Sequence, residues 1–236
     1  VAGDRTSIAV DRTSHRSALA GLVLSGAIPT WILPSIHPEF GIPVGMQSSA
    51  LSSLTNEVAV FVTSPAYVGT ISDFGPLARA AHADNRLLIV DQAWGAHLDF
   101  GVGNIKSALQ CGADVVVTSI HKALLGYSQT ATISISDRAI DTARVDRAVD
   151  TTATTSPSAT LLASIDATRA VMQRDGHRAI ERAIEIADEV RKVLRAVTGV
   201  VVIDSDSTGV SVDPLKVTLW LPRTGLTGTE DRKSVV

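Results

Sequence analysis

The sequence predicts an α/β fold: a three-layer sandwich with a mostly parallel central sheet, followed by the start of a smaller α+β domain. Short runs rich in β-branched residues alternate with segments whose apolar residues recur at helical spacing. Several of these runs are continuously apolar, which is typical of parallel strands covered on both faces by helices. Beyond Pro157 the alternation stops, and two long helical patterns precede two more short strands. The alternation predicts the wound sheet, and the later change of pattern predicts a second unit.

Six runs predict the strands of the sheet. They are residues 7–11, 30–34, 58–63, 86–91, 114–119 and 130–136. Helices are predicted between them at residues 15–25, 73–83 and 104–110. In the first of these helices, Leu19, Leu22 and Val23 form one apolar face.

The second half of the chain predicts helices first and strands afterwards. Pro157 lies near the start of one helix, which is expected to end at Gly176. A second helix follows, and strands are expected at 200–204 and 216–222. The chain therefore divides into residues 1–176, an N-terminally truncated large domain, and residues 177–230, the beginning of a small C-terminal domain. Residues 231–236 are expected to be a non-native tail, so the chain is expected to be part of a longer protein.

Composition narrows the classes of function. The net charge is −3 and aromatic residues make up 4%, which argues against a nucleic-acid partner and against an anionic membrane surface. The single cysteine, Cys111, excludes an internal disulfide and favours a reducing compartment. No apolar run reaches the roughly 18 residues that span a bilayer, and residues 1–12 lack the pattern of a signal peptide. We expect a cytoplasmic protein that does not bind membranes.

Polar residues gather after the strands at the edge where open α/β sheets bind ligands. Residues 11–15 follow the first strand, Asp91 follows the fourth, and residues 119–122 follow the fifth. An acid and a lysine, Lys122, at neighbouring strand ends predict either a structural salt bridge or two contacts with one cofactor. Pyridoxal phosphate needs this pair, because a lysine holds its aldehyde as a Schiff base and a buried carboxylate keeps its ring nitrogen protonated.

Five segments in order then resemble the pyridoxal-phosphate domain of the Orn/Lys/Arg decarboxylase family, in fold type I with the aspartate aminotransferases. The resemblance covers residues 3–176. The segments are DRTSHRSALAGLVLSGAIPTWILP, TSPAYVGTISD, VDQAWGAHLDFG, SALQCGADVVVTSIHKALLGYSQTATISI and TTSPSATLLASIDATRAVM. The resemblance implies the large domain of a pyridoxal-phosphate-dependent transferase fold and a lyase of amino-acid and polyamine metabolism.

The resemblance also implies roles for individual residues. Lys122 is expected to bind the cofactor aldehyde and to move protons, and Asp91 to pair with the pyridine nitrogen. Ala93 is expected on one face of the ring and His15 on the other, although His15 alone also suits a solvent-exposed first helical turn.

Ser119 and His121 are expected near the phosphate or the Schiff base. A histidine at position 121 also suits a side chain that points into the sheet. His97 either supports the site or caps the next loop, and we assign it no role. The other histidines share no metal-ligand spacing, so we predict no metal site.

The sequence departs from the family pattern in two ways. Gln92 and Trp94 replace the acid and histidine of the frequent D-E-A-H-G-A-H motif, and Gln92 is expected to affect proton placement near the ring. The glycine- and serine-rich turn that clasps the phosphate would precede Val1, and most of the family's C-terminal domain is absent from the chain.

The implied reaction is decarboxylation of ornithine, lysine or arginine to the amine and CO2. An aminotransferase or aldolase with the same carbanion chemistry remains an alternative, as does an incomplete, inactive fragment or a scaffold subunit. A nicotinamide-binding fold is disfavoured, because no G-x-G-x-x-G follows a predicted strand. The resemblance implies a homodimer with its site at the subunit interface, reached by residues 154–157, and a small-molecule amino-acid substrate.

Overall fold

The computed structural model describes residues 6–101, 105–136, 140–222 and 224–225. In this part of the chain, six strands form one sheet in the order β2-β1-β3-β4-β5-β6; the first five are parallel and β6 is antiparallel to β5. The strands are β1 Ser7–Asp11, β2 Ile28–Ile32, β3 Ala59–Thr63, β4 Leu87–Asp91, β5 Val115–Ser119 and β6 Ala131–Ile135. The predicted mostly parallel sheet is confirmed.

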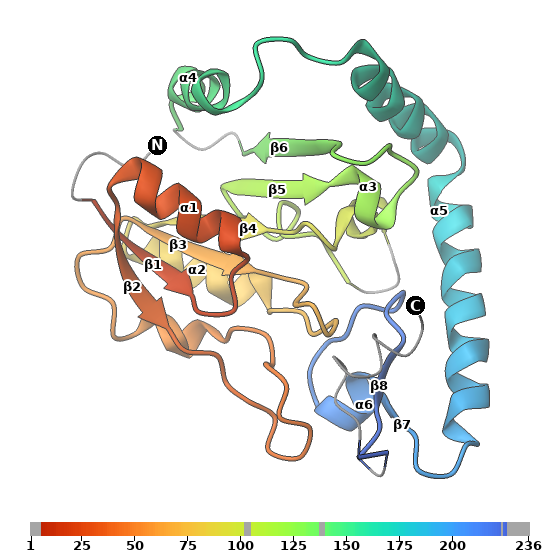
Figure 1. The fold of residues 1–236 in the computed structure, drawn as a ribbon. Helices are drawn as coiled ribbons and strands as arrows, with labels where there is room; N and C mark the ends of the chain where they lie inside the picture. The colour runs from red at the N-terminus through yellow and green to blue at the C-terminus, as the bar shows by residue number, and fades with distance from the viewer. Residues whose placement is uncertain (1–5, 102–104, 137–139, 223, 226–236) are drawn as a thin grey trace.

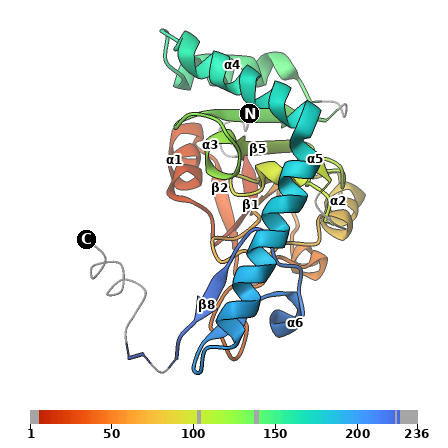
Figure 2. The same ribbon diagram turned by 90° about the vertical axis from the view of Figure 1, so that its right-hand side faces the viewer.

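The central strands are most deeply buried on one face of the sheet. Val60 and Val62 of β3 and Leu88 and Val90 of β4 are 0% exposed. Helix α2 (Phe74–Ala83) packs its apolar face into this core, and α1 (Arg16–Ser25) lies on the opposite side of the sheet (Figures 1 and 2). Each such buried aliphatic side chain contributes about 1.5–3 kcal/mol. The three-layer arrangement explains why these strands are apolar at consecutive positions.

Strand β2 begins and ends two residues earlier than the sequence predicts, at Ile28–Ile32 instead of 30–34. Gly26 ends α1 in the left-handed conformation, with φ of 66°, so the chain can turn directly into the sheet. Pairing begins two residues after Gly26, where Ile28 is in register with Ser7. Pairing stops at Ile32 because its partner, Asp11, is the last residue of β1.

The helix predicted at residues 104–110 is wrong for the part of it that the structure describes, because residues 105–110 hold no helix and only 108–110 form a turn. The amide of Gln92 explains the change, because its Oε1 accepts a hydrogen bond of 2.8 Å from the backbone N–H of Ala108. The buried Gln92 side chain therefore accepts the Ala108 N–H, which in a helix would donate to a backbone carbonyl. Helix α4 (Thr142–Thr152) is not among the predicted helices.

The two long helices predicted around Gly176 form one continuous helix, α5 (Ala159–Arg195). Gly176 does not end it. A Cβ at this position would lie 2.9 Å from Met172 Cε and 3.4 Å from Phe100 Cδ1, so glycine serves close packing against η2 (Ala96–Phe100). Figure 1 shows α5 running down one side of the molecule, from the level of β6 to the second sheet.

The segment after α5 forms a separate antiparallel pair, β7 (Val201–Ile203) with β8 (Thr218–Trp220), and a short helix α6 (Ser205–Thr208) between them. The segment is joined to the loop after β3 by a bridge between Thr70 and Val212. A second, small α+β unit beginning at residue 177 stays a prediction, and the tail at 231–236 lies outside the described residues. In the described part of the chain, no helix combines the length and apolarity needed to cross a membrane.

Candidate active site

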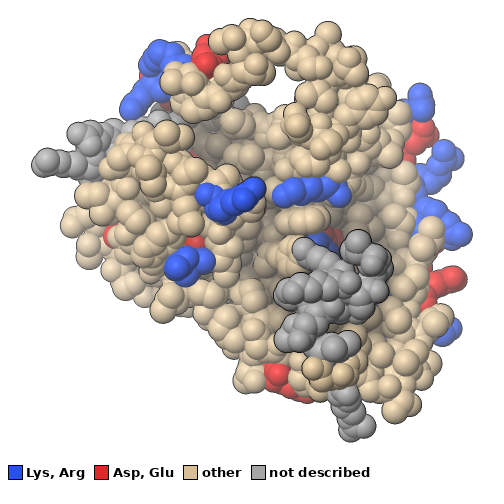
Figure 3. All heavy atoms as spheres, in the orientation of Figure 1, with Lys and Arg blue, Asp and Glu red and all other residues tan. Residues whose placement is uncertain are grey.

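The carboxyl ends of β1, β3, β4 and β5 meet at one edge of the sheet. Thr63 of β3 is in register with Asp91 of β4, and Asp91 with Val117 of β5. The loops that leave these strands carry all the residues predicted from the sequence to form a site. Figure 3 shows lysine and arginine side chains near the middle of one face of the molecule, with few acidic side chains around them.

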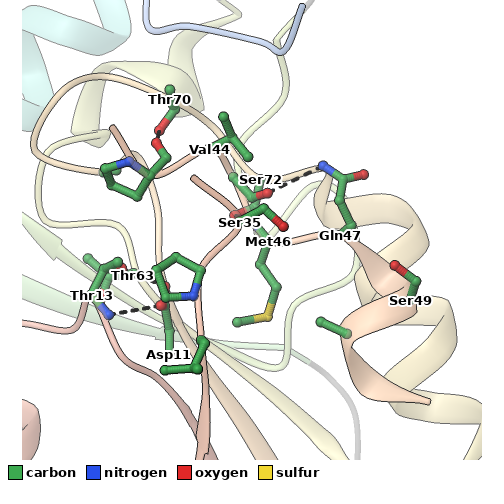
Figure 4. A pocket seen from close by; sticks show the side chains of 16 residues that line it. Asp11, Thr13, Ser35, Val44, Met46, Gln47, Ser49, Thr63, Thr70 and Ser72 are labelled. Carbon is green, nitrogen blue, oxygen red and sulfur yellow. Dashed lines mark hydrogen bonds between the residues drawn. The ribbon is translucent and has the colours of Figure 1, made fainter. Parts of the chain in front are cut away.

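The turn after β1 is fixed by Asp11, which is 6% exposed. Asp11 accepts two hydrogen bonds from Thr13, one from the backbone N–H at 2.9 Å and one from the hydroxyl at 2.8 Å (Figure 4). His15 follows as the N-cap of α1, and its Nδ1 accepts the backbone N–H of Ser17 at 3.2 Å. The neutral His15 ring therefore carries its proton on Nε2, and the ring is exposed. The sequence analysis gave Asp11 no role. Its position at the end of the strand, four residues before His15, was the feature that could have pointed to it.

A small polar cavity of about 210 Å³ lies beside this turn. Hydroxyl groups line much of it, and Figure 4 shows those of Thr13, Thr63, Thr70 and Ser72 around the hollow. Asp11 uses both of its carboxylate oxygens within the turn. The cavity is therefore a hydrogen-bonding space at the edge of the site, bordered by the Asp11 carboxylate.

Asp91 is half-buried at the end of β4. Its Oδ1 accepts the backbone N–H of Ala93 at 3.0 Å, which links two residues that the sequence predicts for the site. Asp91 also borders a mostly apolar cavity of about 330 Å³, which extends to Ser17 and Ala18 of α1. Among the described residues, no lysine, arginine or histidine forms an ion pair with Asp91. An acid without a cation thus faces an apolar space that reaches the helix capped by His15.

Lys122 lies in the short helix α3 (Ile120–Ala123), directly after β5, and is exposed. Its Nζ lies 4.7 Å from the centre of the Trp94 indole. It does not line the cavity beside Asp91, and the alternative of a direct Asp91–Lys122 salt bridge does not occur. The two side chains are therefore presented at the same edge by neighbouring strands without neutralising each other.

Ser119 and His121, the polar residues near Lys122, differ in whether their side chains are already hydrogen-bonded. Ser119 is the N-cap of α3, and its hydroxyl makes no capping bond. The Nδ1 of His121 lies 2.9 Å from the carbonyl oxygen of Thr130, to which it donates a hydrogen bond. His121 is therefore anchored to the chain just before β6, and only its Nε2 can turn toward a ligand.

A lysine that the sequence analysis treated as part of a strand joins this edge. Lys216 Nζ lies 3.8 Å from the centre of the Trp94 indole and 5.3 Å from that of Tyr67. Burial lowers the pKa of Lys216; the Asp213 carboxylate opposes this effect, and the charge of Lys122 adds to it. We call Tyr67, Trp94, Lys122 and Lys216 the Trp94 cluster. The signal in the sequence was the same as for Lys122, a single lysine beside an apolar run.

Two further residues hold the walls of the site. Gln92 is 0% exposed, bonds Ala108 as described above and donates from Nε2 to the carbonyl of Gly95 at 3.1 Å. Both ends of its amide are engaged with the backbone, so the expectation that Gln92 affects proton placement near the ring has no structural support. His97 is 1% exposed, with its Nε2 2.8 Å from Asp213 Oδ1, and thereby ties η2 to the C-terminal segment. Nowhere in the described chain do three His, Cys, Asp or Glu side chains converge as they would around a metal ion.

Comparison with known proteins identifies the family of the chain. Residues 1–208 match the model of the family described as Orn/Lys/Arg decarboxylase, major domain. The chain is 31% identical to arginine decarboxylase of Bacillus subtilis (strain 168) over 99% of its own length and 49% of the relative. It thus spans about half the length of the curated relatives it matches.

Solved structures share the fold. The lysine decarboxylase LdcF of Francisella novicida superposes with a TM-score of 0.80 at 20% identity, over 94% of this chain and 37% of that one. Lysine decarboxylase A of Pseudomonas aeruginosa gives a TM-score of 0.78 at 24% identity, over 98% and 39%. The family model matches most of the chain, and the chain therefore belongs to the Orn/Lys/Arg decarboxylase family, in the part described as its major domain.

Proposed function

We propose that this chain is the cofactor-binding part of a pyridoxal-phosphate-dependent decarboxylase that converts ornithine, lysine or arginine to the corresponding amine and CO2. The observation that carries the proposal is the family match over residues 1–208, together with Asp91 and Lys122 at neighbouring strand ends. Relatives at about this level of identity bear the names arginine decarboxylase and lysine decarboxylase. Which of the three amino acids is used is a matter for experiment.

The chemistry of the side chains at this edge fits pyridoxal phosphate. The cofactor needs an amine for its aldehyde, a carboxylate for its ring nitrogen and donors for its phosphate. Lys122 supplies the amine and Asp91 the carboxylate, and neither is used up in an ion pair with the other. Ser119 has a hydroxyl that does not cap its helix. His15 offers an exposed imidazole, and Ala93 a small side chain one residue beyond Gln92.

When bound, pyridoxal phosphate supplies an electron sink for the electron pair released as CO2 leaves the α-carbon. Asp91 would hold the proton on the ring nitrogen, and its Oδ2 is the oxygen that does not accept the Ala93 N–H. The Lys122 amine would carry protons to and from the substrate. His15, with Nδ1 fixed by Ser17, would lie against the ring and exclude water from that face.

Spectroscopy and product analysis of the full-length protein test this proposal. Added pyridoxal phosphate is expected to give the yellow absorbance of a lysine-bound cofactor, and Lys122→Ala to abolish it. Lys192→Ala, at an exposed position of α5, is the matched control and is expected to retain the colour. Colour that survives Lys122→Ala would overturn the lysine assignment.

Ornithine, lysine and arginine are then supplied in turn. Release of CO2 with formation of the amine supports a decarboxylase, whereas formation of a keto acid identifies an aminotransferase. Loss of Lys122 is expected to lower the rate by a factor on the order of 10²–10⁴ even if cofactor is forced to bind, since a positioned acid–base group contributes about that much.

We also infer that the full-length protein is a homodimer whose site includes the partner subunit. Residues 151–160, which contain the segment expected to reach across, are exposed in the single chain. Sedimentation equilibrium measures the assembly directly. A protein that remains monomeric at the concentrations at which it is fully active would refute the inference.

A further inference from the structure

The Trp94 cluster presents two ammonium groups to one indole. Lys216 Nζ lies 3.8 Å from the centre of the Trp94 ring and Lys122 Nζ lies 4.7 Å from it. Tyr67 meets the same indole edge-on, with ring centres 5.9 Å apart, and its own ring faces Lys216 at 5.3 Å. Lys216 comes from the segment before β8 and Lys122 from the loop after β5, so the fold brings two distant lysines to the same place.

Lys216 is a half-buried cation that the Asp213 carboxylate attracts without forming an ion pair with it. Among the described residues, no carboxylate forms an ion pair with it. Asp213, the nearest acid in sequence, instead bonds His97 Nε2 at 2.8 Å and the backbone N–H of Leu215 at 2.9 Å, both through Oδ1. Contact with an aromatic face compensates a cation by only about 0.5–2 kcal/mol. The lowered pKa of Lys216, which burial causes first, is the expected consequence of a charge that is not fully compensated.

The position of Lys216 therefore favours an anionic ligand. The Lys122 amine, which contacts the same indole, indicates which anion this is. In the proposed function, the substrate's α-amino group would take the place of the Lys122 amine. The carboxylate attached to the same carbon must then lie close to the Lys122 nitrogen. The far end of ornithine, lysine or arginine is cationic and is repelled by a second ammonium group. A cation beside Lys122 thus distinguishes the two ends of such a substrate.

We propose that Lys216 receives the α-carboxylate of the amino-acid substrate and so orients the substrate at Lys122. The assignment rests on the proposed function and adds a specificity-determining residue to it. The charge of the carboxylate disappears as neutral CO2 leaves, so the attraction to Lys216 is strong in the bound substrate and weaker in the transition state. Removing Lys216 therefore raises KM and leaves kcat unchanged or slightly higher.

The test compares the amino acid with its own decarboxylation product, which lacks only the carboxylate. The full-length protein is loaded with pyridoxal phosphate, and binding of lysine against cadaverine, arginine against agmatine and ornithine against putrescine is followed by the change in the cofactor spectrum. Lys216→Met keeps the length and apolar stem of the side chain, and Lys192→Met on the exposed face of α5 is the matched control.

For the amino acid that the protein uses, Lys216→Met is expected to weaken binding on the order of tenfold or more, the scale of a lost hydrogen bond to a charged group. Binding of the matching amine is expected to stay the same or to tighten. The control Lys192→Met is expected to change neither.

Three results overturn the assignment. Equal weakening of amino acid and amine would show a role in the shape of the site alone. Faster loss of pyridoxal phosphate with no preference between the two ligands would assign Lys216 to the cofactor phosphate. Unchanged binding of both would remove it from the site. A wild-type protein that responds to none of the three amino acids instead overturns the proposed function, and this assignment with it.

Discussion

At the scale of single residues, Asp91 is expected to control the rate without controlling cofactor attachment. In the proposed function, Asp91→Asn removes the anion that would hold a proton on the ring nitrogen but leaves Lys122 intact. We predict that the variant stays yellow and that kcat falls by a factor on the order of 10²–10³, as when one preorganised electrostatic group is lost from a site. Absorbance spectra and CO2 release measure the two effects separately.

Asp166→Asn is the control for Asp91→Asn. Asp166 is an exposed carboxylate on α5 that forms an ion pair with the exposed Arg169, a type of contact worth about 0–1 kcal/mol. An Asp91→Asn variant with an undiminished kcat would contradict the role of Asp91, and loss of colour would assign Asp91 to cofactor binding instead.

The sequence predicts Asp91 and Lys122 because each directly follows an apolar strand, and parallel strands align their carboxyl ends. It does not predict the Trp94 cluster. Lys216 enters the cluster only because Asp213 and the bridge at Val212 hold the C-terminal segment against the loop after β3. Contacts of this kind depend on tertiary packing between segments far apart in the chain, and no local pattern encodes them.

At the scale of elements, Gly176 allows α5 to pack closely against η2. A β-branched side chain there would meet Met172 and Phe100, so Gly176→Val is predicted to lower the free energy of unfolding by about 1–3 kcal/mol, as overpacking does. Urea denaturation of the full-length protein measures it. Gly21→Val in α1 is the matched control, because a Cβ at Gly21 meets nothing within 4 Å and valine is at least as good a helix former as glycine.

An equal effect of the two valine substitutions would show that Gly176 matters for its backbone and not for its contact with η2. The same glycine explains the wrong prediction of a helix end. From sequence, a glycine after a helical run indicates a C-cap. In the structure, the side of α5 that carries Gly176 is buried against Phe100. The glycine is therefore there for close packing and does not end the helix.

Another difference at this scale comes from Gln92. Residues 104–110 have apolar positions at helical spacing, yet the described residues 105–110 hold no helix. The buried Gln92 amide accepts a hydrogen bond from the backbone N–H of Ala108. Gln92 lies in a different loop, so the local sequence of residues 104–110 does not reveal this contact. The six strands, by contrast, are predictable from sequence, because a strand covered on both faces has apolar residues at consecutive positions.

At the scale of the whole molecule, the His97–Asp213 hydrogen bond joins the loop after β4 to the segment that carries Lys216. Both side chains are at most 2% exposed. A group left behind without its partner in such a place costs about 1–3 kcal/mol. We therefore predict that His97→Phe and Asp213→Ala each destabilise the full-length protein by about this amount, and that the double variant is destabilised by less than their sum.

The same pair should link stability to substrate orientation. Asp213 lies three residues before Lys216, so releasing it from His97 loosens the segment that presents the Lys216 ammonium to Trp94. We predict that His97→Phe, which leaves the Lys216 side chain itself unchanged, weakens binding of the amino acid more than binding of its amine product. The spectral titration described for Lys216→Met measures this difference. Additive losses of stability, with no difference between the two ligands, would mean that the C-terminal segment is held in place by its backbone pairing with the Thr70 loop, and that His97 has no part in positioning Lys216.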